Sequence, residues 1–109
     1  LINVAEFTQM KPGIIIANTS RGGVICEKAL VNALNSGKVH AIGLDVFEQE
    51  PPSFGEELCD RDDVMLSPHI AGLTDKASER MALACIENAI SYLNGTINPN
   101  LIVNKEALI

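Results

Sequence analysis

The sequence contains few aromatic residues and few basic residues. It has no tryptophan and one tyrosine, and its eight Lys and Arg residues are scattered among fourteen Asp and Glu residues. The formal charge of −6 disfavours nucleic acid or an anionic membrane as a partner, because both reward clustered basic side chains. No apolar run approaches the roughly 20 residues of a membrane span, and no signal peptide opens the sequence. We therefore expect a cytoplasmic protein that binds neither nucleic acid nor a membrane.

Cysteine is scarce as well. Cys26, Cys59 and Cys85 are odd in number, lie far apart and form no C-x-x-C pair. Disulfide frameworks usually have an even number of cysteines, and zinc sites usually have closely spaced pairs. We expect thiols in a reducing compartment and no metal site.

The length and composition fit a globular domain or a piece of one. The chain has 109 residues, of which 47% are hydrophobic and 20% are charged. It has no initiator methionine and begins in the middle of an apolar pattern. We expect a fragment of a longer protein.

Hydrophobic spacing predicts alternating strands and helices. Short β-branched runs are typical of buried parallel strands, and stripes at 3.6-residue spacing indicate helices. The expected elements are a helix over Val4–Lys11, strands over Ile14–Ala17, Ala41–Phe47 and Val64–Leu66, a helix from Cys26 to a Gly37 cap, a helix from a Thr74 cap to Gly95, and a last strand over Leu101–Val103. This order predicts the α/β class, with a parallel sheet that looks like half of a doubly wound one. The Ile14–Ala17 strand is expected to be buried on both faces.

Polar residues follow each predicted strand. Asn18, Thr19, Ser20 and Arg21 follow the first, Asp45 closes the second with Glu48 and Glu50 just beyond, and His69 follows the third. Ligands of open α/β sheets collect at the carboxyl ends of the strands. The sequence therefore predicts that an arginine, carboxylates and a histidine share one edge.

Each of these residues also has a simpler explanation. Arg21 can be a salt-bridge partner at the surface, His69 a packed loop histidine, and Glu50 a solvated side chain. Their shared position at one edge of the predicted sheet favours a catalytic or ligand-binding role over these explanations. A histidine transfers protons near neutral pH, a neighbouring carboxylate orients it, and an arginine binds a carboxylate or a developing negative charge. These groups suit an acid that carries a carbonyl or hydroxyl beside its carboxylate.

Three segments in order, "NTSRGGVI", "GLDVFEQEP" and "SPHIAG", resemble the D-isomer-specific 2-hydroxyacid dehydrogenases. That family includes phosphoglycerate dehydrogenases, D-lactate dehydrogenases and hydroxypyruvate or glyoxylate reductases. The resemblance implies the C-terminal half of a Rossmann-like, doubly wound parallel sheet, followed by a long helix. It assigns residues 1–73 to the NAD(P)-binding domain, and residues 74–109 to a connecting helix and tail that return to the substrate domain.

The resemblance also implies the roles of individual residues. Arg21 binds the substrate, Glu50 is the catalytic acid, and His69 exchanges the proton of the hydroxyl group. The implied reaction is hydride transfer between NAD, or NADP, and C2 of a 2-hydroxy or 2-oxo acid, in a protein that forms a homodimer at full length. The residues implied to line the cofactor are Thr19, Ser20, Arg21, Asp45, His69, Ile70, Ala71 and Gly72.

Other residues near these motifs receive simpler assignments. Glu48 is expected to be solvated, although it shares the segment "FEQEP" with Glu50. Gly22 and Gly23 suit a backbone that turns sharply beside a ligand, or a plain turn from strand to helix.

One family feature is missing from the sequence. A dinucleotide site begins with a G-x-G-x-x-G turn, and the sequence has no such spacing. We therefore expect the 109-residue chain alone to be inactive and to bind NADH poorly. Two alternatives to an enzyme stay open: an NADH-sensing transcriptional corepressor of the same fold, and a structural piece without a function of its own.

Overall fold

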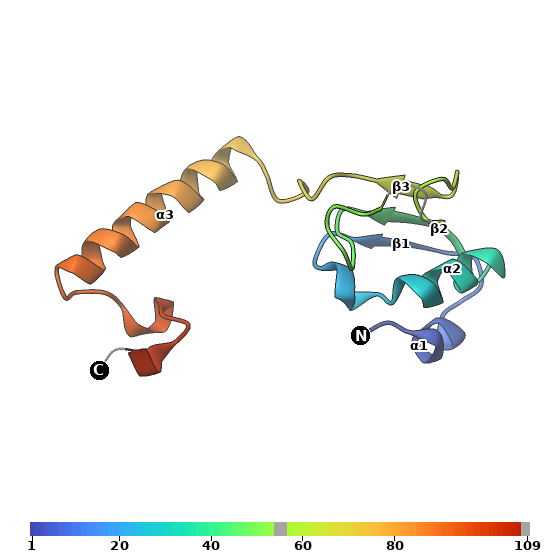
Figure 1. Cartoon of the computed structure of the whole chain (residues 1–109), viewed down its shortest axis with the longest axis horizontal. Coiled ribbons are helices and arrows are strands. Elements are labelled where there is room, and N and C mark those ends of the chain that lie inside the picture. The colour runs from blue at the N-terminus through green and yellow to red at the C-terminus, as the bar shows by residue number, and fades with distance from the viewer. Residues whose placement is uncertain (54–56, 108–109) are drawn as a thin grey trace. The chain divides into compact units, whose positions relative to one another are not determined.

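The computed structural model describes residues 1–53 and 57–107, which belong to two compact units, Leu1–Gly72 and Leu73–Ile109. Residues 54–56 of the proline-rich loop and the last two residues of the tail lie outside the described residues. The elements, in chain order, are α1 (Val4–Gln9), β1 (Ile14–Asn18), the 3₁₀ helix η1 (Gly22–Val24), α2 (Glu27–Asn35), β2 (Val39–Leu44), β3 (Val64–Leu66), α3 (Asp75–Leu93), η2 (Pro99–Leu101) and η3 (Lys105–Ala107) (Figure 1).

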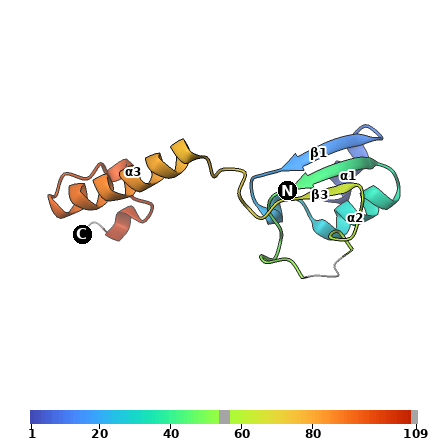
Figure 2. The same ribbon diagram turned by 90° about the horizontal axis from the view of Figure 1, so that it is seen from above.

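The first unit is built on a parallel sheet of strand order β1-β2-β3, in which all strands point the same way (Figure 2). Asn18 pairs with Leu44, and Leu44 pairs with Leu66. The last residues of the three strands thus form one row across the sheet. The loops that follow them therefore leave from the same edge.

The helix α2 covers one face of this sheet, and α1 packs beside α2 (Figure 1). Leu30 is fully buried, and Phe7 of α1 joins the same core. Burying a leucine side chain of this kind stabilises a fold by about 1.5–3 kcal/mol. The other buried members of the core are Ile25, Ala29, Ala33, Leu34, Val39, Ile42, Leu44 and Leu58.

The opposite face of the sheet is open within this chain. Burial alternates along β1, and Ile15 is 69% exposed while Met65 of β3 is 77% exposed. The expectation that Ile14–Ala17 is buried on both faces is wrong for this chain, because the described helices of the first unit cover one side of the strand.

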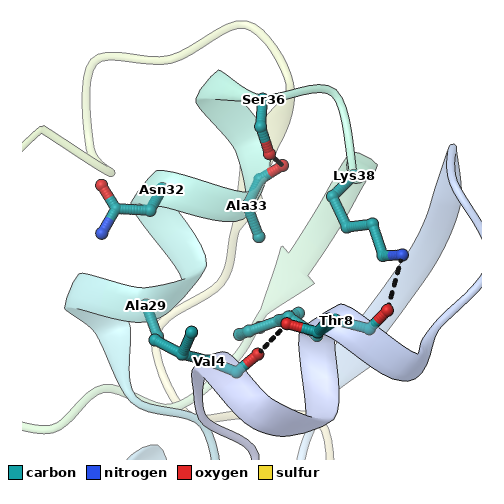
Figure 3. A pocket seen from close by; sticks show the side chains of 8 residues that line it. Val4, Thr8, Ala29, Asn32, Ala33, Ser36 and Lys38 are labelled. Carbon is teal, nitrogen blue, oxygen red and sulfur yellow. Dashed lines mark hydrogen bonds between the residues drawn. The ribbon is translucent and has the colours of Figure 1, made fainter.

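A pocket of about 350 Å³ lies between α1 and α2 (Figure 3). At its rim the Lys38 ammonium group donates a hydrogen bond to the carbonyl oxygen of Thr8, over 3.0 Å. This contact ties the end of α1 to the start of β2. None of the predicted site residues lines the pocket.

Two predicted boundaries of the first unit are wrong. The first helix ends at Gln9 and not at Lys11, with Met10 as its cap. The second strand spans Val39–Leu44 and not Ala41–Phe47. It begins earlier because Val39 pairs with Ile14, and it ends earlier because the Asp45 side chain binds the segment after β3.

In the second unit, α3 begins where its cap predicts. The Thr74 hydroxyl accepts a hydrogen bond from the backbone N–H of Ala77 at 3.1 Å, and Gly95 after the helix has a φ of 68°. The predicted strand over Leu101–Val103 is wrong. Pro99 starts the 3₁₀ helix η2 instead, Val103 is fully exposed, and residues 73–107 contain no strand that could pair with it.

None of the helices within residues 1–53 and 57–107 combines the length and the apolar character that crossing a membrane requires.

Candidate active site

Glu50 and His69 form the centre of the site. The Glu50 Oε2 atom lies 2.7 Å from Nδ1 of the His69 ring, and Oε1 accepts a hydrogen bond from the backbone N–H of Phe47 at 3.1 Å. The hydrogen bond from His69 is the main cause that lowers the pKa of Glu50 below its ordinary 4.5, followed by the Phe47 N–H. The carboxylate is thus charged at neutral pH and can orient the imidazole ring. The His69 side chain is 46% exposed and the Glu50 side chain 38%, so the ring is accessible from solvent.

Asp45 fixes the segment that carries His69. Its carboxylate is buried at the end of β2 and accepts hydrogen bonds from the Ser67 hydroxyl at 2.5 Å and from the backbone N–H groups of Ile70 and Ala71, both at 2.9 Å. The Ser67 hydroxyl is the main cause that lowers the pKa of Asp45 below 3.8. Between these contacts His69 has a φ of 55°, a left-handed conformation that is rare for residues other than glycine. The hydrogen bonds of Asp45 therefore stabilise a backbone turn that directs the His69 side chain toward Glu50.

The turn that carries Arg21 depends on the buried side chain of Asn18. Its Oδ1 accepts from the backbone N–H and the hydroxyl of Ser20, and its Nδ2 donates to the carbonyl oxygen of Arg21 at 3.0 Å. Arg21 itself is exposed and donates to the Ser20 carbonyl. Within the described parts of the chain it makes no ion pair. The salt-bridge explanation of Arg21 thus finds no partner there.

Arg21 also influences Glu50. Its positive charge contributes to the lowered pKa of Glu50, as the smallest of the causes. Arg21 and Glu50 follow the paired ends of β1 and β2, at the edge that the strand order predicts.

Gly22 has a packing role. A Cβ atom at this position would lie 1.8 Å from the carbonyl oxygen of Phe47, whereas one at Gly23 would meet nothing within 4 Å. The close approach of the Phe47 backbone therefore accounts for the glycine at position 22.

Glu48 is exposed, as expected, but its side chain and backbone also make hydrogen bonds to α2. Its Oε1 accepts from the backbone N–H of Glu27 at 2.9 Å, while Oε1 of Glu27 accepts from the backbone N–H of Glu48 at 2.7 Å. Glu27 opens α2, where N–H groups lack partners within the helix and a negative charge is favoured. This contact joins residues 21 positions apart, and no local sequence pattern predicts it.

The comparisons with known proteins agree with this geometry. Residues 1–71 match the family model described as D-isomer specific 2-hydroxyacid dehydrogenase, NAD binding domain. The chain belongs to this family.

Its relatives are reductases and dehydrogenases. The chain is 45% identical over 108 residues to a glyoxylate reductase of Thermococcus litoralis, covering 99% of this chain and 32% of that protein. It resembles the crystal structure of a glyoxylate reductase from Paecilomyes thermophila with a TM-score of 0.77 and 44% identity, covering 84% of this chain and 27% of the other. A family member from Xanthobacter autotrophicus Py2, solved in complex with NADPH and MES, has a TM-score of 0.76 and 34% identity, with 87% and 38% covered. The chain thus spans about a third of the length of the curated relatives that it matches.

The residues at the sheet edge suit the nicotinamide end of the cofactor that this family binds. Asp45 Oδ2 accepts one hydrogen bond, from Ala71, and a carboxylate oxygen has room for a second. Thr19 and Ser20 are exposed beside it at the end of β1, and Ile70, Ala71 and Gly72 are exposed after β3. Asp45 Oδ2 could therefore accept one further hydrogen bond, such as one from an amide N–H of the cofactor.

The contacts of Asn18 and Glu48 are the parts of the site that the sequence does not reveal. Asn18 directly precedes the "TSR" segment, at the end of β1. A polar residue that ends a buried strand is a signal that could have marked it, because buried amides need hydrogen-bond partners.

Proposed function

We propose that this chain provides the substrate-binding and proton-transfer edge of an NAD(P)-dependent oxidoreductase that interconverts a D-2-hydroxy acid and its 2-oxo acid. The observation that carries the proposal is the contact between Glu50 and His69, at 2.7 Å, on the edge that also bears Arg21. Relatives named as reductases favour an enzyme over the corepressor alternative.

In this proposal each of the three side chains has a separate task. Arg21 binds the substrate carboxylate or the carbonyl oxygen, because its guanidinium fork matches such groups. Glu50 holds Nδ1 of His69, so Nε2 is the atom that exchanges a proton with the substrate oxygen. His69 donates that proton during reduction and removes it during oxidation.

Thr19, Ser20, Arg21, Asp45 and the segment 69–72 would line the nicotinamide end of the cofactor. A cofactor held there would supply the hydride for C2 of the oxo acid, or take it up from the hydroxy acid. The relative solved with NADPH supports both NAD and NADP as candidates.

We infer the remaining organisation from the relatives. Residues 1–73 would be the C-terminal half of the NAD(P)-binding domain, and residues 74–109 the connection that returns to a substrate domain. Glyoxylate and hydroxypyruvate, which appear in the names of the relatives, are the first substrates to test. A cytoplasmic homodimer is the expected assembly of the full-length protein.

A chimera tests the proposal. In it, this chain replaces the 108 aligned residues of the Thermococcus litoralis glyoxylate reductase, which supplies the rest of the enzyme. We expect the chimera to reduce glyoxylate, and His69→Ala to lower kcat at least about 100-fold, the usual contribution of a general acid. NADH binding should stay close to that of the parent chimera.

His40 provides the matched control, because it is the other histidine of the chain and is exposed on β2. His40→Ala should leave kcat within about twofold, as surface substitutions usually do. Equal losses in the two histidine variants, or a folded chimera that binds NADH without reducing glyoxylate, would contradict the proposal.

A further inference from the structure

Glu48 and Glu27 connect the two halves of the candidate site. Glu50 lies two residues after Glu48, in the loop that follows β2. Arg21 lies just before η1, which leads directly into Glu27 at the start of α2. The reciprocal hydrogen bonds between Glu27 and Glu48, at 2.7 and 2.9 Å, therefore join the segment after Arg21 to the loop that carries Glu50.

The loop has a second anchor on the same segment. The Phe47 carbonyl lies so close to Gly22 that a side chain there would collide with it. Phe47 also donates its N–H to Glu50 Oε1. Residues 47, 48 and 50 are thus each held in place, and two of the three anchors lie on the segment from Gly22 to the start of α2 at Glu27.

Resting on the proposed function, we propose that Glu48, with Glu27 as its partner, is a positioning residue of the reaction. It sets the location of Glu50, and therefore of the His69 ring, relative to Arg21. Neither glutamate needs to touch the substrate. A misplacement of about 1 Å at a reacting group can cost 100-fold in rate, so a contact that fixes the loop can matter as much as a catalytic group.

Substitutions of Glu48 in the chimera separate positioning from charge. Glu48→Ala removes the acceptor of the Glu27 N–H and should lower kcat by about 10- to 100-fold. Glu48→Gln keeps an acceptor oxygen on a side chain of the same length, so its kcat should lie within about threefold of that of the unsubstituted chimera. Glu48→Asp keeps the charge but is shorter by one methylene, so its kcat should lie between these two values.

Glu6 is the matched control for stability. It accepts a backbone hydrogen bond from Asn3 at 2.8 Å near the start of α1, and is remote from the Glu50 loop in sequence. Glu6→Ala should cost a similar amount of stability and leave kcat within about twofold. Thermal unfolding followed by circular dichroism verifies that every variant is folded at the assay temperature.

The pH profile gives a readout that a purely structural role would not change. Glu50→Gln removes the carboxylate partner of the imidazolium, so the alkaline limb of glyoxylate reduction should move to lower pH. Glu48→Ala should move this limb in the same direction by a smaller amount, whereas Glu48→Gln and Glu6→Ala should not.

The outcomes distinguish the two proposals. If Glu48→Ala matches Glu6→Ala in both kcat and pH profile, Glu48 is structural and this inference is wrong. If Glu48→Ala does not fold, unchanged kcat and pH profile in Glu48→Asp would refute the inference. If Glu50→Gln and His69→Ala leave turnover intact, the proposed function itself fails, whatever Glu48 does.

Discussion

The helices α2 and α3 carry apolar stripes of similar spacing, but they differ in what covers them. In α2 the stripe Ala29, Leu30, Ala33 and Leu34 is buried against the sheet. In α3 the stripe of Ala77, Met81, Cys85, Ile86, Ala89, Ile90 and Leu93 contains no buried residue. Periodicity therefore predicts that a segment is helical, but the burial of its apolar face depends on a partner.

The largest difference between the two helices should appear on truncating their apolar side chains. Leu30→Ala in α2 should lower the free energy of unfolding by about 2–5 kcal/mol, because the residue is fully buried. Ile90→Ala in α3, at a position that is 53% exposed, should change it by no more than about 0.5 kcal/mol. Urea denaturation of the 109-residue chain, followed by far-UV circular dichroism, measures both. Similar losses in the two variants would show that α3 is covered in solution.

Gly22 and Gly23 differ in how densely their surroundings in the first unit are packed. Gly22→Ala should cost about 1–3 kcal/mol, since the Phe47 backbone must move to accept the new methyl group. Gly23→Ala meets open space and should be neutral or stabilising by up to about 1 kcal/mol. Denaturation of the same chain measures the two changes. A neutral Gly22→Ala would mean that the loop of Glu50 is loosely held, which would also weaken the role proposed for Glu48.

The smallest expected effect is a local loss of stability at acidic pH. The pKa of Asp45 is lowered in the folded chain, chiefly by the Ser67 hydroxyl, so the charged form stabilises the fold. This contribution is present above the ordinary value of 3.8 and is lost as the pH falls through the lower, folded pKa. Below about pH 4 the amides of Ile70 and Ala71 should lose protection from hydrogen exchange before the amides of the α2 core.

Ser67→Ala checks this assignment. Without the hydroxyl donor, the pKa of Asp45 should rise and the loss of protection should begin at higher pH. An unchanged onset in Ser67→Ala would show that Asp45 is not the group that titrates.

Most of the fold follows from the sequence because its signals are local. The strands at Ile14 and Val64, the Gly37 cap and the Thr74 cap depend on neighbouring residues, and these features appear within one residue of the expected positions. The predictions are wrong where the extent of a strand depends on residues that are distant in the sequence. Val39 joins β2 because Ile14 lies beside it, and the apolar run at Leu101 forms no strand because the described part of its unit, residues 73–107, offers no strand to pair with.

In the candidate site as well, local sequence signals allow predictions and long-range contacts do not. Arg21, Glu50 and His69 could be named because they follow strands and resemble family motifs. Their roles stay predictions until turnover is measured. The contacts of Glu48 with Glu27, and of Asp45 with Ser67, could not be predicted because each spans more than 20 positions.

The row formed by Asn18, Leu44 and Leu66 limits how this sequence can change in length. Each site loop starts at this row, and one residue of strand corresponds to about 3.3 Å. Deleting a single residue from β2 would draw Asp45 and Glu50 back by that distance and reverse the faces of the strand. Insertions and deletions should therefore be tolerated in the connections at the opposite edge of the sheet and selected against within the strands, so the length of each strand is itself part of the site.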